Sequence, residues 1–570
     1  MKRAVAYSSL NGGIWTKELR GRVDLARYPT AATDSLNCLA LTLGPVTRRP
    51  GTHDIAATEG NQPAMLGRFV FNDDQAYILE WTAGWLRFIQ RGALVMDGAA
   101  PIRVASPYQA SHLSAIRSAQ SADIVYLACR DVRPHRLSRY GQTNWTLEPI
   151  VFRDGPYRDP WPGMPAVTLS GVTMTFGAAV ASADWVGQCI RFQIDGSWYW
   201  RRVTAVASPT SITAIVEPGA DVPGLAGEVQ ASFSIVVDAD GANGEVIPIP
   251  VAWQPVLSAD NLRVTVNTLT LTPTLHYTIV GGSEIHLTQA ALPHVTVTVV
   301  NLLLAAEPAD VVTGMISNWR APAWGGARGW PSCVALFEQR TWWAGTTAEP
   351  VSIWASVTGD YETCSPTETD AKVLDDNGLY LIAADQEVSQ IQWMMPGDNI
   401  WLGTAGGEYI CRASELSEAL TAANANIRPQ TTEGSAPVEP IRIDSSVVFV
   451  SRGRAGVHTL TYDPDADGMI TPDLAQLAQD VTAPGVQQLA WCRLPNRLLW
   501  CLLADGTLAS LTHSPRDQVQ AWHRHQMQDG KVLSIASLPE PGGDALYLVT
   551  ERTGADNVTR RRVERMADRW

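Results

Sequence analysis

One acidic stretch has the spacing of a metal-binding loop. Residues 463–468 read DPDADG, which places carboxylates at positions 1, 3 and 5 and glycine at position 6 of a calcium loop. Such a loop also needs a bidentate glutamate at position 12, where this chain has Leu474, and Asp473 falls one position short. We therefore expect a solvated turn between strands here rather than a calcium site.

A pair of histidines is the second candidate for chemistry. His523 and His525 are two residues apart, so on a strand both side chains lie on one face and could reach one ion. No cysteine, aspartate or third histidine lies within the usual short ligand spacing. We predict a structural role, in which ring N–H groups bind neighbouring backbone.

Catalytic motifs give no usable pattern. No nucleophile elbow, phosphate-binding loop, H-E-x-x-H or G-x-G-x-x-G stands in a suitable context. A glycosidase would need paired carboxylates, for which Asp360, Asp385 and Asp505 are candidates. Aspartate usually forms the turn in which it stands, and Asp505 precedes Gly506, a common hairpin pair. We predict a protein that is not an enzyme, with no catalytic residue, cofactor site or metal ligand.

Arginine clusters are the remaining charged feature. Arginine pairs with carboxylates through two parallel hydrogen bonds. With 43 basic and 57 acidic residues, the chain carries a net charge of −14, which favours pairing between subunits over DNA recognition. The equal alternative is that these arginines stand on a solvated rim and pair with no other subunit. The candidate interface residues are Arg20, Arg22, Asp24, Arg48, Arg49, Arg560, Arg561 and Arg562.

A recurring hairpin organises the chain around these residues. Each copy has an aromatic residue near the start of a strand, a turn with glycine, and a second short strand. The aromatic anchors are Tyr77, Tyr126, Trp343, Trp401, Phe449, Trp500 and Tyr547. Successive anchors are 49, 217, 58, 48, 51 and 47 residues apart, and four-stranded propeller blades repeat every ~40–50 residues. The spacing predicts an all-β propeller of about seven blades, with six or eight left open.

The interval of 217 residues marks an insertion. We expect an N-terminal segment and the first blades in 1–160, inserted β-barrel or β-sandwich modules in 161–235 and 236–305, and the remaining blades in 306–570, closing on the N-terminal part. Short strands at barrel spacing and alternating apolar residues favour the two modules. Helix signal is sparse: 413–425 is the best candidate, and 473–480 favours a turn or two.

The positions of the cysteines and the lengths of the apolar runs indicate the kind of compartment in which the protein assembles. The eight cysteines form no C-x-x-C pair, and Cys129, Cys411, Cys492 and Cys501 lie in or beside apolar strands. We expect them to be buried and assembly to occur in a reducing compartment. The first residues lack the apolar stretch of a signal peptide, and no apolar run reaches the ~20 residues of a membrane helix, which predicts no membrane insertion.

An ordered set of short motifs resembles a known family. The N-terminal motifs are Gly12-Gly13, Arg20–Asp24 with Tyr28, Asn37-Cys38 and Arg48–Thr52. Further motifs follow in order: Asp123–Tyr126, Asn144–Leu147, Gly329–Pro331, Glu338–Arg340, Ile353–Ser356, Thr358–Tyr361, Gly406–Glu408, Asp505–Leu508, Ala521–His525 and Val563–Arg565. Together they are similar to the tail nozzle family of short-tailed bacteriophages, also called tail tubular or tail hub proteins. The resemblance covers essentially the whole chain and is weakest in the inserted modules.

This resemblance implies a structural virion protein. It would form a homohexameric ring under the portal adaptor protein, retain packaged DNA, and conduct it during ejection. The implied partners are the adaptor, tail fibres or spikes, and double-stranded DNA that passes through the lumen without tight binding. The implied location is the virion tail, after assembly in the host cytoplasm. The residues alone leave open a polysaccharide-cleaving propeller enzyme and a cellular propeller scaffold.

Overall fold

The computed structural model of the protein describes residues 9–194, 196–215, short strands between 232 and 301, and 313–568 except 384–388, 416, 417 and 466. Two compact units are present. The first comprises 1–150, 327–362 and 375–570, and the second comprises 151–326 and 363–374.

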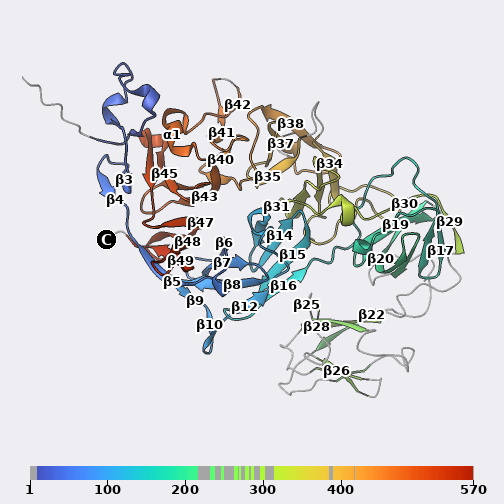
Figure 1. The fold of residues 1–570 in the computed structure, drawn as a ribbon. Helices are drawn as coiled ribbons and strands as arrows, with labels where there is room; N and C mark the ends of the chain where they lie inside the picture. Colours follow the sequence, from blue (N-terminus) through green and yellow to red (C-terminus); the bar gives the residue numbers. More distant parts are fainter. Residues whose placement is uncertain are drawn as a thin grey trace, which may run out of the picture. The chain divides into compact units, whose positions relative to one another are not determined.

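The first unit is a β-propeller of seven antiparallel sheets (Figure 1); six have four strands, and the sheet of β6 to β12 has a short fifth strand, β9 (Ala93–Leu94), paired with β8. Six of these sheets take their main strands in chain order, because short turns favour antiparallel neighbours. The first three complete blades along the chain are β6 (Met65–Val70), β7 (Ala76–Thr82), β8 (Trp85–Gln90) and β12 (Arg103–Ala105); β13 (Arg117–Ser121), β14 (Ile124–Cys129), β15 (Val132–Arg139) and β16 (Trp145–Pro149); and β31 (Cys333–Phe337), β32 (Arg340–Ala344), β33 (Ser352–Ala355) and β34 (Leu379–Ile382).

Three more blades follow without interruption. They are β35 (Ile391–Pro396), β36 (Ile400–Thr404), β37 (Glu408–Ala413) and β38 (Ala425–Thr431); β39 (Ile441–Ile443), β40 (Ser446–Val450), β41 (Val457–Asp463) and β42 (Gly468–Ile470); and β43 (Val486–Cys492), β44 (Leu498–Leu503), β45 (Leu508–Ser514) and β46 (Val519–His525). A short helical stretch, η9 (Gln476–Ala478) and α1 (Gln479–Thr482), precedes β43, as the sequence predicts for 473–480.

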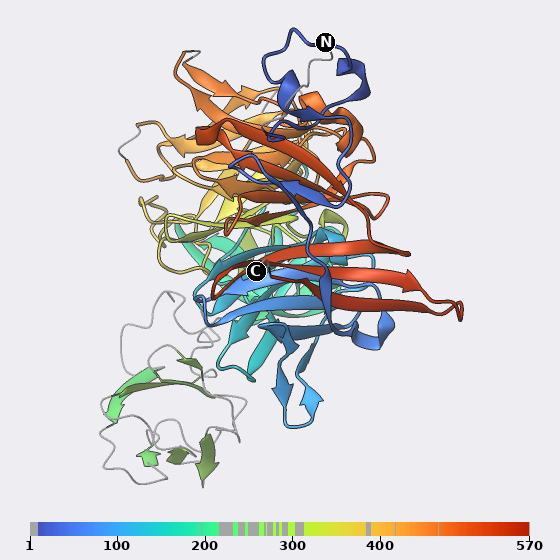
Figure 2. The same cartoon turned by 90° about the vertical axis from the view of Figure 1, so that its left-hand side faces the viewer.

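The seventh blade joins the two ends of the chain. Strands β47 (Gly530–Glu540), β48 (Gly543–Thr553) and β49 (Thr559–Met566) pair with β5 (Thr52–Ala57), which comes from the N-terminal side. The register places Met566 opposite Thr52 and Arg562 opposite Ala57. In Figure 2 this blue segment runs beside the red strands. An exposed strand edge invites pairing with other chains, and this arrangement covers the edge of β49.

The prediction of a propeller is confirmed, and the repeat has a simple structural meaning. All seven aromatic anchors lie on the second strand of their blade, from Tyr77 on β7 to Tyr547 on β48. Six anchors are buried, and Trp401 is half-buried. Wide rings on this strand fill the space between neighbouring twisted sheets: Phe449 on β40, for example, packs with Trp393 of the preceding blade.

The second unit contains a seven-stranded sheet with its own core. Its order is β29 (Thr313–Ile316), β17 (Val167–Ser170), β18 (Thr173–Phe176), β21 (Ser211–Ile215), β20 (Ser197–Ser208), β19 (Cys189–Ile194) and β30 (Trp319–Arg320). Both edges of the sheet therefore come from one stretch, 313–320. The sequence predicts that this stretch belongs to the propeller, because nothing local distinguishes it from a blade strand. Buried Trp319 ties it to the core that contains Leu169 and Phe192.

Two small sheets lie within the described strands of 232–301. One has the order β22 (Ser232–Val237), β28 (Val295–Asn301), β24 (Leu262–Val266) and β25 (Leu269–Thr270); the other is β23 (Val246–Pro248), β27 (Glu284–Leu287) and β26 (Tyr277–Val280). Strand β22 straddles the expected module boundary at 235 and pairs with β28. The remaining residues of 216–312 lie outside the described part of the chain.

The helix predicted for 413–425 is wrong for the residues described there. Strand β37 ends at Ala413 and β38 begins at Ala425. The loop between them is held by the Asn424 side chain, whose oxygen accepts a hydrogen bond from the Thr421 N–H at 2.8 Å. Tertiary contact overrides helix propensity, since the Leu420 N–H donates to Glu338 of another blade. Within the described residues, no helix is long and apolar enough to cross a membrane.

The prediction of burial holds for Cys129, Cys411, Cys492 and Cys501. All eight cysteines are free thiols; Cys38 is half-buried and the other seven are buried. Burial raises the pKa of the Cys411 thiol to about 12 and raises the pKa of Cys492 and Cys501 further. These thiols are therefore protonated at neutral pH and act as small apolar side chains.

Candidate functional site

The N-terminal arm, residues 9–50, docks on the outer strand β46. Its first strand, β1 (Gly13–Ile14), lies against β46, and Ile14 enters the core of that blade. Gly13 has a φ of +66°, and a Cβ atom there would lie 2.3 Å from the Trp522 nitrogen. Only glycine fits such a close approach, which explains why glycine stands at position 13 of the Gly12-Gly13 motif.

A second segment of the arm, residues 35–37, pairs with the outer edge of β46 through backbone hydrogen bonds. The Asn37 N–H donates to the Arg524 carbonyl at 2.9 Å, and the Arg524 N–H donates to the Ser35 carbonyl at 3.0 Å. Asn37 also accepts the Gln526 N–H through its side chain at 3.1 Å. The arm thereby covers part of the edge that β46 would otherwise expose.

The two histidines serve this docking. His523 Nε2 accepts the Ala40 N–H at 2.9 Å, so its proton resides on Nδ1, which faces Ser510 Oγ at 3.3 Å. Ser510 Oγ in turn lies 2.8 Å from His525 Nε2. The role is structural, as predicted, but the polarity is reversed, because the ring accepts from backbone. In the described part of the chain, no group of three His, Cys, Asp or Glu side chains could hold a metal ion.

The loop with Arg20, Arg22 and Asp24 stands at the surface. Arg22 and Asp24 pair with each other at 2.7 Å while their side chains stay 53% and 59% exposed. The hydrogen bond from Arg22 lowers the pKa of Asp24. An exposed pair of this kind adds little stability. Arg20 is exposed and has no ion-pair partner among the described residues, and neighbouring Val23 is 76% exposed.

Arg48 and Arg49 differ in spite of their adjacency. Arg48 ends β4 (Val46–Arg48), is exposed, and pairs with no carboxylate in the described part of the chain. Arg49 is half-buried and donates to the Pro50 carbonyl at 3.1 Å and to Asn37 at 3.4 Å. Burial lowers the pKa of Arg49, with Glu564 opposing. Only Arg48 of this pair is therefore open to a partner.

The C-terminal arginines are engaged within the chain. Arg560 pairs with Asp556 at 2.5 Å and Arg561 with Glu551 at 2.8 Å. Arg562 pairs with Asp54 and so links β49 to β5. The structure thus separates the eight interface candidates: Arg20 and Arg48 keep open guanidinium groups, whereas Arg560, Arg561 and Arg562 are paired within the chain, and Arg562 joins β49 to β5.

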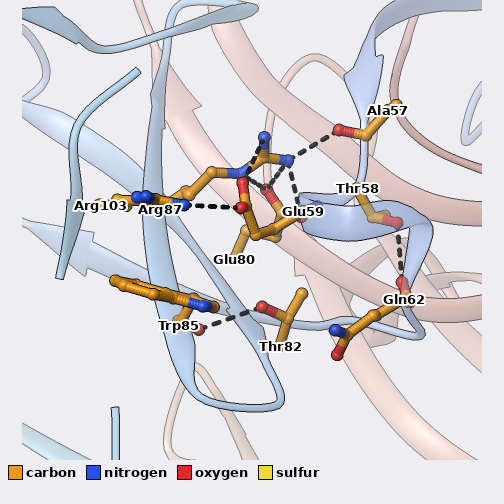
Figure 3. A network of polar contacts seen from close by, with 9 residues as sticks. All are labelled: Ala57, Thr58, Glu59, Gln62, Glu80, Thr82, Trp85, Arg87 and Arg103. Carbon is orange, nitrogen blue, oxygen red and sulfur yellow. Dashed lines mark hydrogen bonds and ion pairs between the residues drawn. The ribbon is translucent and has the colours of Figure 1, made fainter. Parts of the chain in front are cut away.

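Sequence reasoning missed a buried ionic network beside that closure (Figure 3). Arg87 on β8 pairs with Glu80 on β7 at 2.6 Å and with Glu59 at 3.3 Å, and it donates to the Ala57 carbonyl at 2.7 Å. Glu59 begins η3 (Glu59–Asn61), directly after β5. Arg103 binds the outer side of Glu59 at 3.2 Å. We call these residues the closure network.

The closure network is buried at its centre. The Glu80 side chain is 0% exposed and that of Arg87 is 7% exposed. Burial raises the pKa of Glu80, and Arg87 opposes that shift. The sequence carried a signal, because two opposite charges stand in the otherwise apolar hairpin 76–89, at positions that face each other across the strands.

The acidic candidates form local turns. Asp505 accepts the Thr507 N–H at 2.9 Å and Asp360 accepts the Glu362 N–H at 3.1 Å. Asp385 lies outside the described residues. In the calcium-like stretch, Asp463 accepts the Asp465 N–H at 2.9 Å, as a solvated turn requires.

Comparison with known proteins gives no family assignment. No protein-family model matches this chain, and no curated protein matches it. A function must therefore be argued from the fold, its contacts and the sequence motifs.

Proposed function

We propose that the protein is a nozzle subunit of a short bacteriophage tail. It would form a six-fold ring, retain packaged DNA, and conduct that DNA during ejection. The proposal starts from the motif resemblance. The observation that carries it is that motifs recognised only by their order along the chain contact one another in space.

Two contacts join the first motifs to the last. Asn37 of the Asn-Cys motif binds Arg524 of the 521–525 motif through backbone hydrogen bonds. Thr52 ends the Arg-Arg-Pro-Gly-Thr motif, and its hydroxyl donates to Glu564 of the 563–565 motif at 2.5 Å. These partners are separated by 487 and 512 residues along the chain.

Four further motifs meet within one blade and its neighbour. Arg340 donates to the Ser356 carbonyl at 2.7 Å, and the Gly359 N–H donates to the Gln339 carbonyl at 2.8 Å. Tyr361 packs edge-on against Tyr126 of the preceding blade, with ring centroids 5.9 Å apart. Short chance matches would have no reason to coincide with the joints of one architecture. The contacts therefore support reading the motifs as a coherent set.

The propeller also suits a wall segment. A closed ring of blades has few free strand edges and is rigid. Subunits that assemble into a larger ring need a head-to-tail interface that closes by rotation. The surface of the N-terminal arm, with open Arg20 and Arg48 and exposed Val23, offers groups for such an interface. Under this proposal, the portal adaptor and the tail fibres or spikes would bind other faces of the ring.

The test uses the full chain. We expect negatively stained images to show six-fold rings, and mass photometry to show a species of six times 61.8 kDa, about 371 kDa. The reading frames beside this one should encode a portal and an adaptor. A monomer at every concentration, with and without that adaptor, would refute the proposal. Cleavage of an envelope polysaccharide by the purified chain would instead favour the enzyme alternative.

A further inference from the structure

A cavity of about 590 Å³ opens between two neighbouring blades of the propeller. Its walls come from the β6–β7 loop, the end of β8, the β13–β14 turn and the end of β15. In a four-stranded blade these connections emerge on one face, because consecutive strands alternate in direction. We call it the Tyr77 cavity, after the buried anchor at its base, and its volume is typical of small-molecule sites.

The charges on the cavity walls are balanced. Asp123 pairs with Arg139 at 2.7 Å, and Asp74 pairs with Arg91 at 2.5 Å. Each guanidinium is thus neutralised by a carboxylate, so the cavity has little attraction for a phosphate or another anion. Each carboxylate is also held by an arginine, which makes the pair unsuited to acid–base cleavage of a sugar bond.

Unused hydrogen-bonding capacity faces this space. Tyr77 is 1% exposed and its ring packs against Phe69 and Trp145, yet its hydroxyl has no partner among the described residues. Because Tyr77 lines the cavity and its hydroxyl oxygen is not closed off from solvent, this hydroxyl is available to a ligand in the cavity.

The amides and carboxylates add more free positions. Gln142 uses its amide N–H to reach Gln90 at 3.2 Å, which leaves its carbonyl oxygen open. Gln75 accepts from Arg139 at 2.7 Å, which leaves its own N–H groups open. Asp74 and Asp123 each use one oxygen in their ion pairs. The free positions are mostly acceptors with some donors, which matches a ligand that carries several hydroxyl groups.

An exposed aromatic ring completes the lining. Tyr140 is 57% exposed and borders the same cavity. Its face can cover the apolar C–H side of a sugar ring, while its hydroxyl stays in water. We propose that the Tyr77 cavity binds a neutral carbohydrate without cleaving it. Tyr140 would stack on the sugar, and Tyr77, Gln142, Asp74 and Asp123 would bind its hydroxyl groups. This proposal is independent of the role in a phage tail.

Maltotriose, cellotriose and tri-N-acetylchitotriose serve as probes, in saturation-transfer NMR and calorimetric titration with the full chain. We expect at least one to bind, and expect Tyr140→Ala and Gln142→Ala each to weaken that binding by at least about tenfold. Both residues are exposed, so the fold should survive, and thermal denaturation checks this. Tyr462→Ala is the matched control, since Tyr462 is 55% exposed and lies on another blade.

Four outcomes would overturn the assignment. The first is that none of the three sugars binds. The second is that a sugar binds equally to the wild type and to both cavity variants. The third is that inorganic phosphate competes with the sugar, because the arginines would then act as free cations. Loss of binding in Tyr462→Ala as well would also place the sugar elsewhere.

Discussion

Closure of the propeller depends most on a single charged side chain, that of Arg87. Its guanidinium meets the Glu80 carboxylate on β7, the Glu59 carboxylate just after β5, and the carbonyl of Ala57 at the end of β5. A fork of five N–H donors can serve all three at once, which a lysine could not do. The cost of burying a charge is offset only while this partner set is complete.

Arg87→Met should therefore be strongly destabilising. It would leave Glu80 buried without its partner, and breaking such a pair costs about 3–5 kcal/mol. Arg103→Met is the matched control, because Arg103 binds Glu59 from the exposed side and such pairs contribute about 1 kcal/mol or less. Denaturant unfolding of the two variants measures the difference. Equal midpoints would contradict the assignment of the closure network.

His513 should make the propeller sensitive to acid. Burial lowers its pKa to about 4 in the folded protein, with Arg497 adding to the shift and Asp444 opposing it. In the unfolded chain the pKa is about 6.5, so between these values the unfolded state binds more protons. Stability from this group is complete above pH 6.5 and is lost as the pH falls toward 4.

The sensitivity can be measured against a variant that does not titrate. Between about pH 7 and 4.5, the wild type should lose about 2 kcal/mol more unfolding free energy than His513→Asn. Denaturant unfolding at the two pH values gives both numbers. The same pH dependence in both proteins would show that His513 does not carry the effect.

At the scale of elements, the pairing of β5 with β49 decides which arginines are available. Arg562 faces Asp54 across that pairing, and Thr52 and Arg552 both bind Glu564 beside it. The sequence clusters these arginines and gives no sign that Arg562 pairs with Asp54, which comes from the opposite end of the chain. An interface role for Arg560, Arg561 and Arg562 would compete with these internal pairs.

Charge reversal should separate the two arginine clusters. Arg562→Glu would place a carboxylate beside Asp54 and loosen β5, which hydrogen exchange of residues 52–57 should detect as faster exchange. Adding Asp54→Arg should restore protection by reversing the pair. Arg48→Glu should leave that exchange unchanged and impair only assembly of the proposed six-fold ring of subunits. Faster exchange of residues 52–57 in Arg48→Glu, or unchanged exchange of these residues in Arg562→Glu, would contradict this division.

At the scale of the molecule, the chain alternates between two units. It leaves the propeller after Ile150, returns at Ala327, and contributes 363–374 to the second unit from the loop before β34. The boundaries follow the cores, since Trp319 and Trp324 are fully buried and belong to the second unit. A domain boundary at 305 would cut through that unit.

Two deletions test the boundaries. Replacing 151–326 with a flexible Gly-Ser linker should leave a folded, β-rich propeller, because blades pack mainly on adjacent blades. Replacing only 161–305 should leave 313–320 without its sheet and expose Trp319, which favours aggregation. Circular dichroism and size-exclusion chromatography distinguish the two. A soluble 161–305 deletion with an aggregated 151–326 deletion would reverse the domain division.

The net charge of the whole chain predicts weak contact with DNA. A six-fold ring would carry six times −14, or −84, and DNA is itself densely negative. A conduit also needs contacts that break easily as the genome moves. We expect binding to duplex DNA to be weaker than about 1 µM near physiological salt, measured by fluorescence anisotropy. Nanomolar affinity would contradict a conduit of this kind.

The sequence alone determined the repeating unit of this protein. A period near 50, with an aromatic on the second strand of each copy, is a local pattern that turn chemistry and strand alternation write directly into the chain. It predicted the propeller, the buried cysteines and the turn-forming aspartates. Each of these features depends on residues close together in sequence.

Only the tertiary structure decided the partners over long range. Local pattern could not show that β5 completes the last blade, that 313–320 supplies both edges of the inserted sheet, or that Arg562 meets Asp54. It could not show that the β6–β7 loop and the β13–β14 turn enclose the Tyr77 cavity either. Such pairings depend on where the backbone path brings distant segments together, and many registers are compatible with the same local propensities.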